Sequence, residues 1–289
     1  MTLPNRTQLL PDRPGVPPMA QMPEAETIDI EALARAYASG DIDLVCVLGP
    51  TASGKTRYAV QLARALGGQG LSGASLRDPI RANCPPKAEI LSADSRQVYR
   101  GMDIGTGKDL GEYGNVPYHL IDIVEAGSKY NIYEYQAAFA KAWADVRSRG
   151  CVPILCGGSG LYIEAATRAY RFDKGNGVPA EALPRRTFYI GTLVSREERV
   201  GRIDRRLDER LEEGLVEEVR GLLERGVPAD TLIWYGLEYK FVTQYLTGQL
   251  DYDGMRILLA NAIHQFAKRQ MTWFRGMERD GVRIHWVRV

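Results

Sequence analysis

The sequence predicts an α/β fold, in which a mostly parallel sheet carries helices on both faces and the C-terminal third is mainly helical. Two observations lead to this prediction. Short apolar runs typical of buried strands alternate along the chain with stretches of helical spacing. The first such run, at residues 44–48, passes through a glycine-rich turn directly into a helical stretch. A strand followed by a helix is the repeating unit of a parallel sheet.

The glycine-rich turn fits the phosphate-binding pattern G-x-x-x-x-G-K-[ST]. It consists of Gly49, Pro50, Thr51, Ala52, Ser53, Gly54, Lys55 and Thr56. The glycines let backbone N–H groups converge on a phosphate, and the following helix N-terminus adds partial positive charge. Lys55 supplies a full charge, and the Thr56 hydroxyl is the expected ligand of Mg²⁺. The turn therefore predicts a P-loop NTPase-like fold that binds a phosphate or a diphosphate, although it does not specify ATP.

The other elements follow from apolar spacing and from Gly, Pro and Asn signals. We expect strands at residues 88–92, 118–123, 152–156 and 187–193. We expect helices at residues 28–39, 131–149, 160–170, 196–211, 215–224 and 251–278. Residues 1–27 carry six prolines and are expected to form a disordered or loosely ordered tail, and residues 67–87 a long surface loop. Residues 28–289 are then expected to form a single domain.

Composition excludes several other classes of protein. The 289 residues are 45% hydrophobic and 25% charged, which is ordinary for a globular protein. No apolar run reaches the roughly 18 residues of a transmembrane helix, and no apolar signal segment is seen at the N-terminus. The four cysteines lack zinc-site spacing, and Cys46 and Cys156 fall in predicted strands, so we expect a cytoplasmic protein with reduced thiols. The net charge of +1 argues neither for nor against a nucleic-acid partner.

Asp94 lies just after the predicted strand at residues 88–92. In an open parallel sheet, this position is on the same rim as the phosphate-binding turn. A carboxylate there is typical of a catalytic base or a metal ligand, and it also suits a helix N-cap. A second glycine-rich turn from strand to helix is expected on this rim and suits a second phosphate or nucleotide contact; it contains Gly157, Gly158 and Ser159.

Basic and aromatic residues are interleaved near the end of the last predicted helix, in the stretch AKRQMTWFR at residues 267–275. An amphipathic helix with solvated cations fits this pattern, and so does a contact surface for nucleic acid or diphosphate. The spacing alone does not separate these two interpretations.

Five stretches together resemble the tRNA dimethylallyltransferases, also called isopentenyltransferases. They are GPTASGKT, ILSADSRQVYRGMDIGTGK, PYHLIDI, ILCGGSGLYIEA and AKRQMTWFRG, in the order in which that family carries them. They cover most of residues 44–170 and 252–277, and as a set they are far more specific than the phosphate-binding turn alone.

The resemblance implies transfer of a dimethylallyl group from dimethylallyl diphosphate to the N6 amine of the adenine next to the anticodon of a tRNA, with release of diphosphate. It implies that the phosphate-binding turn holds this diphosphate rather than ATP. Asp94 is expected to take the proton of the amine. Lys55, Thr56, a hydroxyl of the turn and Mg²⁺ are expected to stabilise the leaving diphosphate.

The resemblance also implies how the acceptor is held. That family flips the adenine out of the RNA into a channel through the protein. Ser95 and Gln97 are expected to position this adenine. The basic stretch near the C-terminus is expected to contact adenine or tRNA through Lys268, Arg269, Gln270 and Arg275. The protein is expected to act as a monomer away from membranes.

Two features depart from the family pattern. Members that modify tRNA carry a helical insertion of several dozen residues that grips the anticodon stem, and here residues 171–186 leave no room for it. The stretch R-x-V-G-[YF]-[RK] has Ile233 and Glu238 at its two basic positions. Both departures predict fewer cations for tRNA phosphates.

Three alternatives therefore remain open. The acceptor is a free adenine nucleotide (AMP, ADP or ATP), as in the adenylate isopentenyltransferases; or the chain is a catalytically silent, tRNA-binding relative; or it is a P-loop kinase of a small metabolite. A strand ending in the metal-binding Asp of such kinases is not evident.

Overall fold

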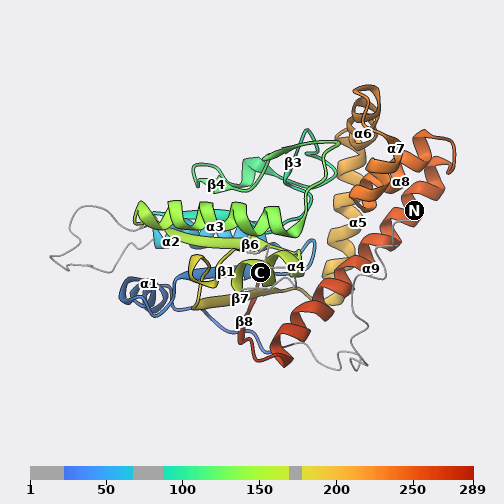
Figure 1. The fold of residues 1–289 in the computed structure, drawn as a ribbon. Helices are drawn as coiled ribbons and strands as arrows, with labels where there is room; N and C mark the ends of the chain where they lie inside the picture. Colours follow the sequence, from blue (N-terminus) through green and yellow to red (C-terminus); the bar gives the residue numbers. More distant parts are fainter. Residues whose placement is uncertain (1–22, 68–86, 169–177) are drawn as a thin grey trace.

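The computed structural model of this chain describes residues 23–67, 87–168 and 178–289 (Figure 1). In this part of the chain, the main sheet has six strands, all parallel, in the order β4-β2-β6-β1-β7-β8. The strands are β1 (Leu44–Leu48), β2 (Ala88–Ser92), β4 (Tyr118–His119), β6 (Val152–Gly157), β7 (Thr187–Leu193) and β8 (Ile284–Arg288). A small second sheet pairs β3 (Tyr99–Arg100) with β5 (Val124–Glu125). The predicted parallel α/β fold is confirmed.

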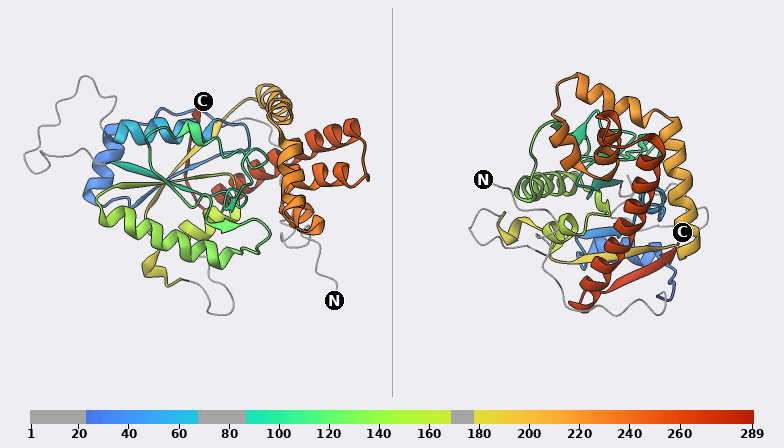
Figure 2. Two further views of the ribbon diagram at one scale, coloured as in Figure 1. Left: turned by 90° about the horizontal axis from the view of Figure 1, so that it is seen from above. Right: turned by 90° about the vertical axis from the view of Figure 1, so that its right-hand side faces the viewer.

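Helices cover both faces of the main sheet, as Figure 2 shows from above. They are α1 (Ile30–Ser39) and α2 (Lys55–Leu66) on one face, and α3 (Ile132–Ser148), α4 (Gly160–Thr167) and the end of α9 (Tyr252–Arg279) on the other. The strand residues alternate accordingly, because successive side chains of a strand point to opposite faces. Leu44, Cys46 and Leu48 of β1 pack toward α3, whereas Val45 and Val47 pack toward α2.

A helical lobe stands at the carboxyl ends of the strands (Figure 1). It contains α5 (Arg196–Glu212), α6 (Leu215–Glu224), α7 (Ala229–Tyr235), α8 (Leu237–Leu246) and the first half of α9. These helices enclose a third apolar cluster with Val98, Tyr99 and Met102, which follow β2. The lobe is thereby packed against the rim that carries the phosphate-binding turn.

Several predicted elements differ in the structure. The strand expected at residues 118–123 ends at His119, because Leu120 and Asp122 adopt left-handed backbone conformations with φ of 65° and 56°. Strand β8 and helix α7 were not predicted, since both are short. The last residues of the expected tail contact the sheet, as the Glu26 N–H donates to the Trp286 carbonyl at 2.6 Å. Residues 1–22, most of the 67–87 loop and residues 169–177 lie outside the described residues.

Glu89 of β2 is a buried carboxylate at the edge of the sheet, with a side chain that is 5% exposed. It accepts from Arg149 Nη2 at 2.8 Å and lies 2.7 Å from His119 Nε2 of β4. Hydrogen bonding from Arg149 lowers the pKa of Glu89 from 4.5 to about 2. The pKa is depressed in the folded protein, so the stabilisation is complete above about pH 4.5 and is lost as the pH falls toward about 2.

We therefore expect Glu89→Gln to lower the free energy of unfolding at neutral pH by about 2–3 kcal/mol, because Arg149 loses its buried charged acceptor and keeps only Asp145 as a charged partner. The difference from the unaltered protein should shrink as the pH is lowered from about 4.5 to 2. Urea unfolding at several pH values measures this. Glu224→Gln, at an exposed position of α6, is the matched control. An equal decrease in the free energy of unfolding in both variants would contradict the role of Glu89.

Candidate active site

The phosphate-binding turn connects β1 to α2 at the rim of the sheet. Gly54 adopts a left-handed conformation (φ 77°) and so does Ala52 (φ 58°), which turns successive N–H groups to one side. The Ser53 and Thr192 hydroxyl oxygens lie 2.6 Å apart and are buried, so the turn is fixed to the neighbouring strand β7. A Cβ atom at Gly49 would lie 2.1 Å from Thr192 Oγ1, so this packing requires glycine at the start of the turn.

Lys55 begins α2 and bends back over the turn. Its Nζ donates to the Pro50 carbonyl at 3.4 Å, a long hydrogen bond that an anion in the turn would replace. Burial lowers the pKa of Lys55; the positive charges of Arg206 and Arg210 act in the same direction, and Asp94 opposes them. All of these charges therefore lie near one position, where a diphosphate would be held.

Asp94 and the second glycine-rich turn meet on the same rim, as the sequence predicted. Ser159 Oγ accepts from the Ser95 N–H at 3.0 Å, which joins the end of β2 to the start of α4. Asp94 Oδ1 accepts from the Arg96 N–H at 2.9 Å, so one carboxylate oxygen orients the turn and the other has no hydrogen bond among the described residues. A Cβ atom at Gly157 would lie 2.2 Å from the Ala93 carbonyl oxygen, which explains the glycine there.

Gln97 follows Asp94 in the segment after β2. Its Nε2 donates to the Gly107 carbonyl at 3.1 Å, and its Oε1 accepts from Ser92 Oγ at 3.1 Å. The side chain thus connects the end of β2 to the glycine-rich loop at residues 101–108. The expectation that Gln97 and Ser95 position an adenine stays a prediction.

Gln270 of α9 joins the two glycine-rich turns. Its Oε1 accepts from the Thr51 N–H at 2.8 Å, and its Nε2 donates to the Gly158 carbonyl at 2.9 Å. The side chain is held in the interior, since the residue is only 7% exposed. The sequence placed Gln270 among contacts to adenine or tRNA, and that role stays a prediction. In the structure, both ends of its amide are used to position the turns.

Lys268 and Arg269, by contrast, are exposed on the outside of α9. Arg269 lies over the Phe266 ring, with its guanidinium carbon 6.0 Å from the ring centre. Arg275 is partly buried and pairs with Glu278 at 2.5 Å. The basic stretch is therefore divided between an exposed pair of cations and one paired arginine.

The charged helix expected at residues 196–211 fits by composition a solvated helix face or a helix over a phosphate site, and the sequence analysis did not assign its arginines to the site. Arg202, Arg206 and Arg210 recur every four residues and so share one helix face, which lies toward the phosphate-binding turn. Arg206 pairs with Asp109, and both Arg206 and Arg210 lie against Gly107. The spacing is visible in the sequence, but it cannot show which element α5 faces.

Arg210 also explains the acidic residue at one of the expected basic positions. Arg210 and Glu238 form an ion pair of 3.5 Å, with side chains that are 12% and 20% exposed. Burial raises the pKa of Glu238 and lowers that of Arg210. Glu238 thus neutralises an arginine of α5 at this site, and the pair adds no net positive charge.

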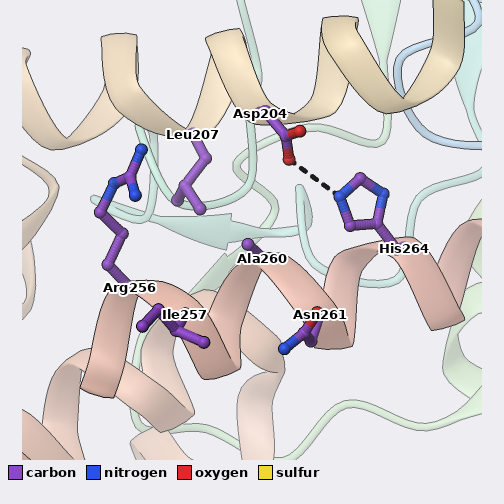
Figure 3. Close-up of a pocket in the computed structure, with 7 residues that line it drawn as sticks. All are labelled: Asp204, Leu207, Arg256, Ile257, Ala260, Asn261 and His264. Atoms are coloured by element: carbon purple, nitrogen blue, oxygen red, sulfur yellow. Dashed lines mark hydrogen bonds and ion pairs between the residues drawn. The ribbon is translucent and has the colours of Figure 1, made fainter. Parts of the chain in front are cut away.

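Contacts on another face of α5 hold it against α9 (Figure 3). His264 Nε2 lies 2.8 Å from Asp204 Oδ1, and Arg256 Nε donates to Asp208 Oδ1 at 2.9 Å. These contacts border a pocket of about 340 Å³ between the two helices. They fix the rotation of α5 about its axis and so direct its arginines toward the turn.

The fold and this site define a P-loop protein in which a phosphate-binding turn, a lysine, arginines and a carboxylate converge at the end of a parallel sheet. The sequence model of the IPP transferase family matches residues 97–185 and 174–277. The chain belongs to the IPP transferase family.

Relatives with curated names extend this match. The chain is 45% identical to tRNA dimethylallyltransferase 1 of Porphyromonas gingivalis, over 84% of this chain and 93% of that protein. It is 42% identical to tRNA dimethylallyltransferase 2 of Bacteroides fragilis, over 86% and 93%. A tRNA isopentenylpyrophosphate transferase from Bacillus halodurans superimposes with a TM-score of 0.69 at 28% identity, over 85% of this chain and 89% of that one. A eukaryotic dimethylallyltransferase acting on tRNA shares the fold, with a TM-score of 0.67 at 18% identity, over 83% and 73%.

The same comparisons bear on the shortened segment after α4. The alignment with the P. gingivalis relative runs over 303 positions but uses 84% of the 289 residues here, so several dozen positions of that relative have no counterpart. The two matches to the family model overlap at residues 174–185, between α4 and β7. This is where the sequence analysis expected a reduced insertion.

Proposed function

We propose that this protein transfers the dimethylallyl group of dimethylallyl diphosphate to the N6 amine of an adenine in tRNA, next to the anticodon. The observation that carries the proposal is that Asp94, the phosphate-binding turn with Lys55, and the arginines of α5 converge on one rim of the sheet. The names of the relatives support tRNA as the acceptor.

We further propose that the protein works as a monomer in the cytoplasm. No helix in the described residues has the length and apolar character needed to cross a membrane.

Different residues of the site act on the acceptor amine and on the departing diphosphate. The N6 nitrogen attacks the allylic carbon of the donor, a new C–N bond forms, and the C–O bond to the diphosphate breaks. Asp94 accepts the proton that the amine loses. Lys55, Arg206 and the N–H groups of the turn stabilise the charge that develops on the departing diphosphate, an effect that depends on charges fixed in place before reaction.

We propose Mg²⁺ as a cofactor, held by the Thr56 hydroxyl at the first turn of α2. Within the described residues no group of three His, Cys, Asp or Glu is arranged to hold a metal ion. Mg²⁺ keeps several waters and takes its other ligands from substrate phosphates, so a single hydroxyl at the phosphate-binding turn suits it. When bound, the ion would neutralise charge on the diphosphate.

The proposal is tested by following label from radiolabelled dimethylallyl diphosphate in the presence of Mg²⁺. Two acceptors are compared in parallel, an unmodified tRNA with adenines beside the anticodon and a mixture of AMP, ADP and ATP. We expect label in the tRNA. Label only in the nucleotides would overturn tRNA as the acceptor and place the protein with the adenylate isopentenyltransferases. Label in neither would overturn the proposed transfer.

A further inference from the structure

A second pocket, of about 340 Å³, lies at the opposite end of β7 from the phosphate-binding turn. It is formed where β7 and β8 begin, beside the turn that follows α9. Its lining includes three arginines, Arg185, Arg186 and Arg283, together with Phe188 and His285. The His285 ring stacks on Phe188 with centroids 4.4 Å apart.

The three arginine side chains are exposed and form no ion pair within the described residues. The backbone that carries two of them is nevertheless fixed, because the carboxylate of Asp43 accepts from the Arg185 and Arg186 N–H groups at 3.0 and 3.1 Å. The Thr187 hydroxyl beside them is buried and makes no hydrogen bond in this part of the chain.

The carboxylates near this pocket all have partners of their own. Glu26 lies 2.7 Å from His285, and Asp280 lies 3.7 Å from Arg168. Asp43 is occupied by the two backbone N–H groups. No carboxylate in the described residues forms an ion pair with these three arginines, so their guanidinium groups are available to a phosphate.

The pocket lies within reach of an RNA that occupies the active site. Thr187 begins β7 and Thr192 contacts the phosphate-binding turn, a separation of about 17 Å along the strand. The last part of α9 spans about the same distance from Lys268 to Arg279. On it, the exposed residues Lys268, Thr272 and Arg279 share one face.

We propose that the Arg185–Arg186–Arg283 pocket binds backbone phosphates of the acceptor RNA, whose strand runs along the exposed face of α9 from the adenine to the pocket. This inference rests on the proposed function, since it takes tRNA as the acceptor. Arg185 of the pocket lies in residues 174–185, where the two matches to the family model overlap.

The test uses the full chain with Arg186→Gln and Arg283→Gln, singly and together, and Arg220→Gln on α6 as the matched control. Arg220 is likewise exposed and has no ion pair within the described residues. The affinity for unmodified tRNA is measured by fluorescence anisotropy over a range of salt concentrations, without the donor. The double variant should bind tRNA roughly tenfold more weakly at moderate salt, and the slope of log affinity against log salt should fall by roughly 0.7 to 0.9 for each arginine removed. The KM for dimethylallyl diphosphate should be unchanged.

The outcomes separate this inference from the proposed function. If the pocket variants have the same tRNA affinity and salt slope as Arg220→Gln, the pocket is not an RNA site. Transfer of label to tRNA by the unaltered protein would still support the proposed function in that case. If the unaltered protein binds tRNA without transferring label, the salt slopes still decide the role of the pocket. Failure of the unaltered protein to bind tRNA would overturn both.

Discussion

Replacement of Asp94 by asparagine should lower the rate of transfer by about 10²–10⁴, the usual contribution of a positioned general base. Asparagine keeps a side-chain oxygen in place to accept from the Arg96 N–H, so the turn after β2 is preserved. What the variant loses is the negative charge that takes the proton. The loss should therefore appear in kcat, measured with saturating donor and tRNA, and the affinity for both substrates should change little.

Asp230→Asn, on an exposed position of α7, is the matched control for Asp94→Asn. Asp94→Glu adds a comparison in which the charge is kept but displaced by one methylene. A kcat for Asp94→Asn equal to that of Asp230→Asn would remove Asp94 from the proton transfer. Loss of donor binding instead of kcat would assign Asp94 to the diphosphate site.

The parts of the fold that the sequence predicted are those determined by local patterns. The apolar run at residues 44–48 and the following turn specify a strand, a phosphate-binding loop and a helix without reference to the rest of the chain. The helix at residues 131–149 was equally clear from its Asn131 cap, its apolar residues at helical spacing and Gly150 after it, and the structure shows that Asn131 forms a capping box with Glu134. Elements at the sheet edges were less predictable, since short strands such as β4 and β8 depend on a neighbouring strand for their backbone hydrogen bonds.

The candidate site was predictable in its loops and not in its supporting helices. The phosphate-binding turn and Asp94 belong to strand ends whose position in a parallel sheet follows a general rule. The orientation of α5 depends on packing against α9, through pairs such as His264 and Asp204 that are 60 residues apart in sequence. From the sequence alone the arginines of α5 fit both a solvated helix face and a helix over a phosphate site, and only the tertiary structure separates the two.

The ion pair between Arg210 and Glu238 illustrates the same limit of prediction from sequence. Read alone, Glu238 at an expected basic position indicates a weakened anion site. In the structure it lies beside Arg210, and the pair is largely buried near the cations that surround Lys55. The charge balance of a site is a property of the side chains that meet in space, and a single position in one motif does not determine it.

Replacement of Gln270 by leucine should lower kcat/KM for dimethylallyl diphosphate by about 10², although Gln270 is placed behind the turns and not at the reacting atoms. Leucine fills a similar volume but leaves the Thr51 N–H and the Gly158 carbonyl without their partner, at a cost of about 1–3 kcal/mol for each buried group. The two turns would then relax relative to each other, and Thr51 belongs to the turn that holds the diphosphate. Gln270→Glu keeps the acceptor for Thr51 and loses the donor for Gly158, so an intermediate effect is expected.

Gln265→Leu makes the same substitution at an exposed position of α9 and should leave the kinetics unchanged. If Gln270→Leu instead weakened tRNA binding and left the donor kinetics intact, Gln270 would be a contact to RNA and not the connection between the two turns.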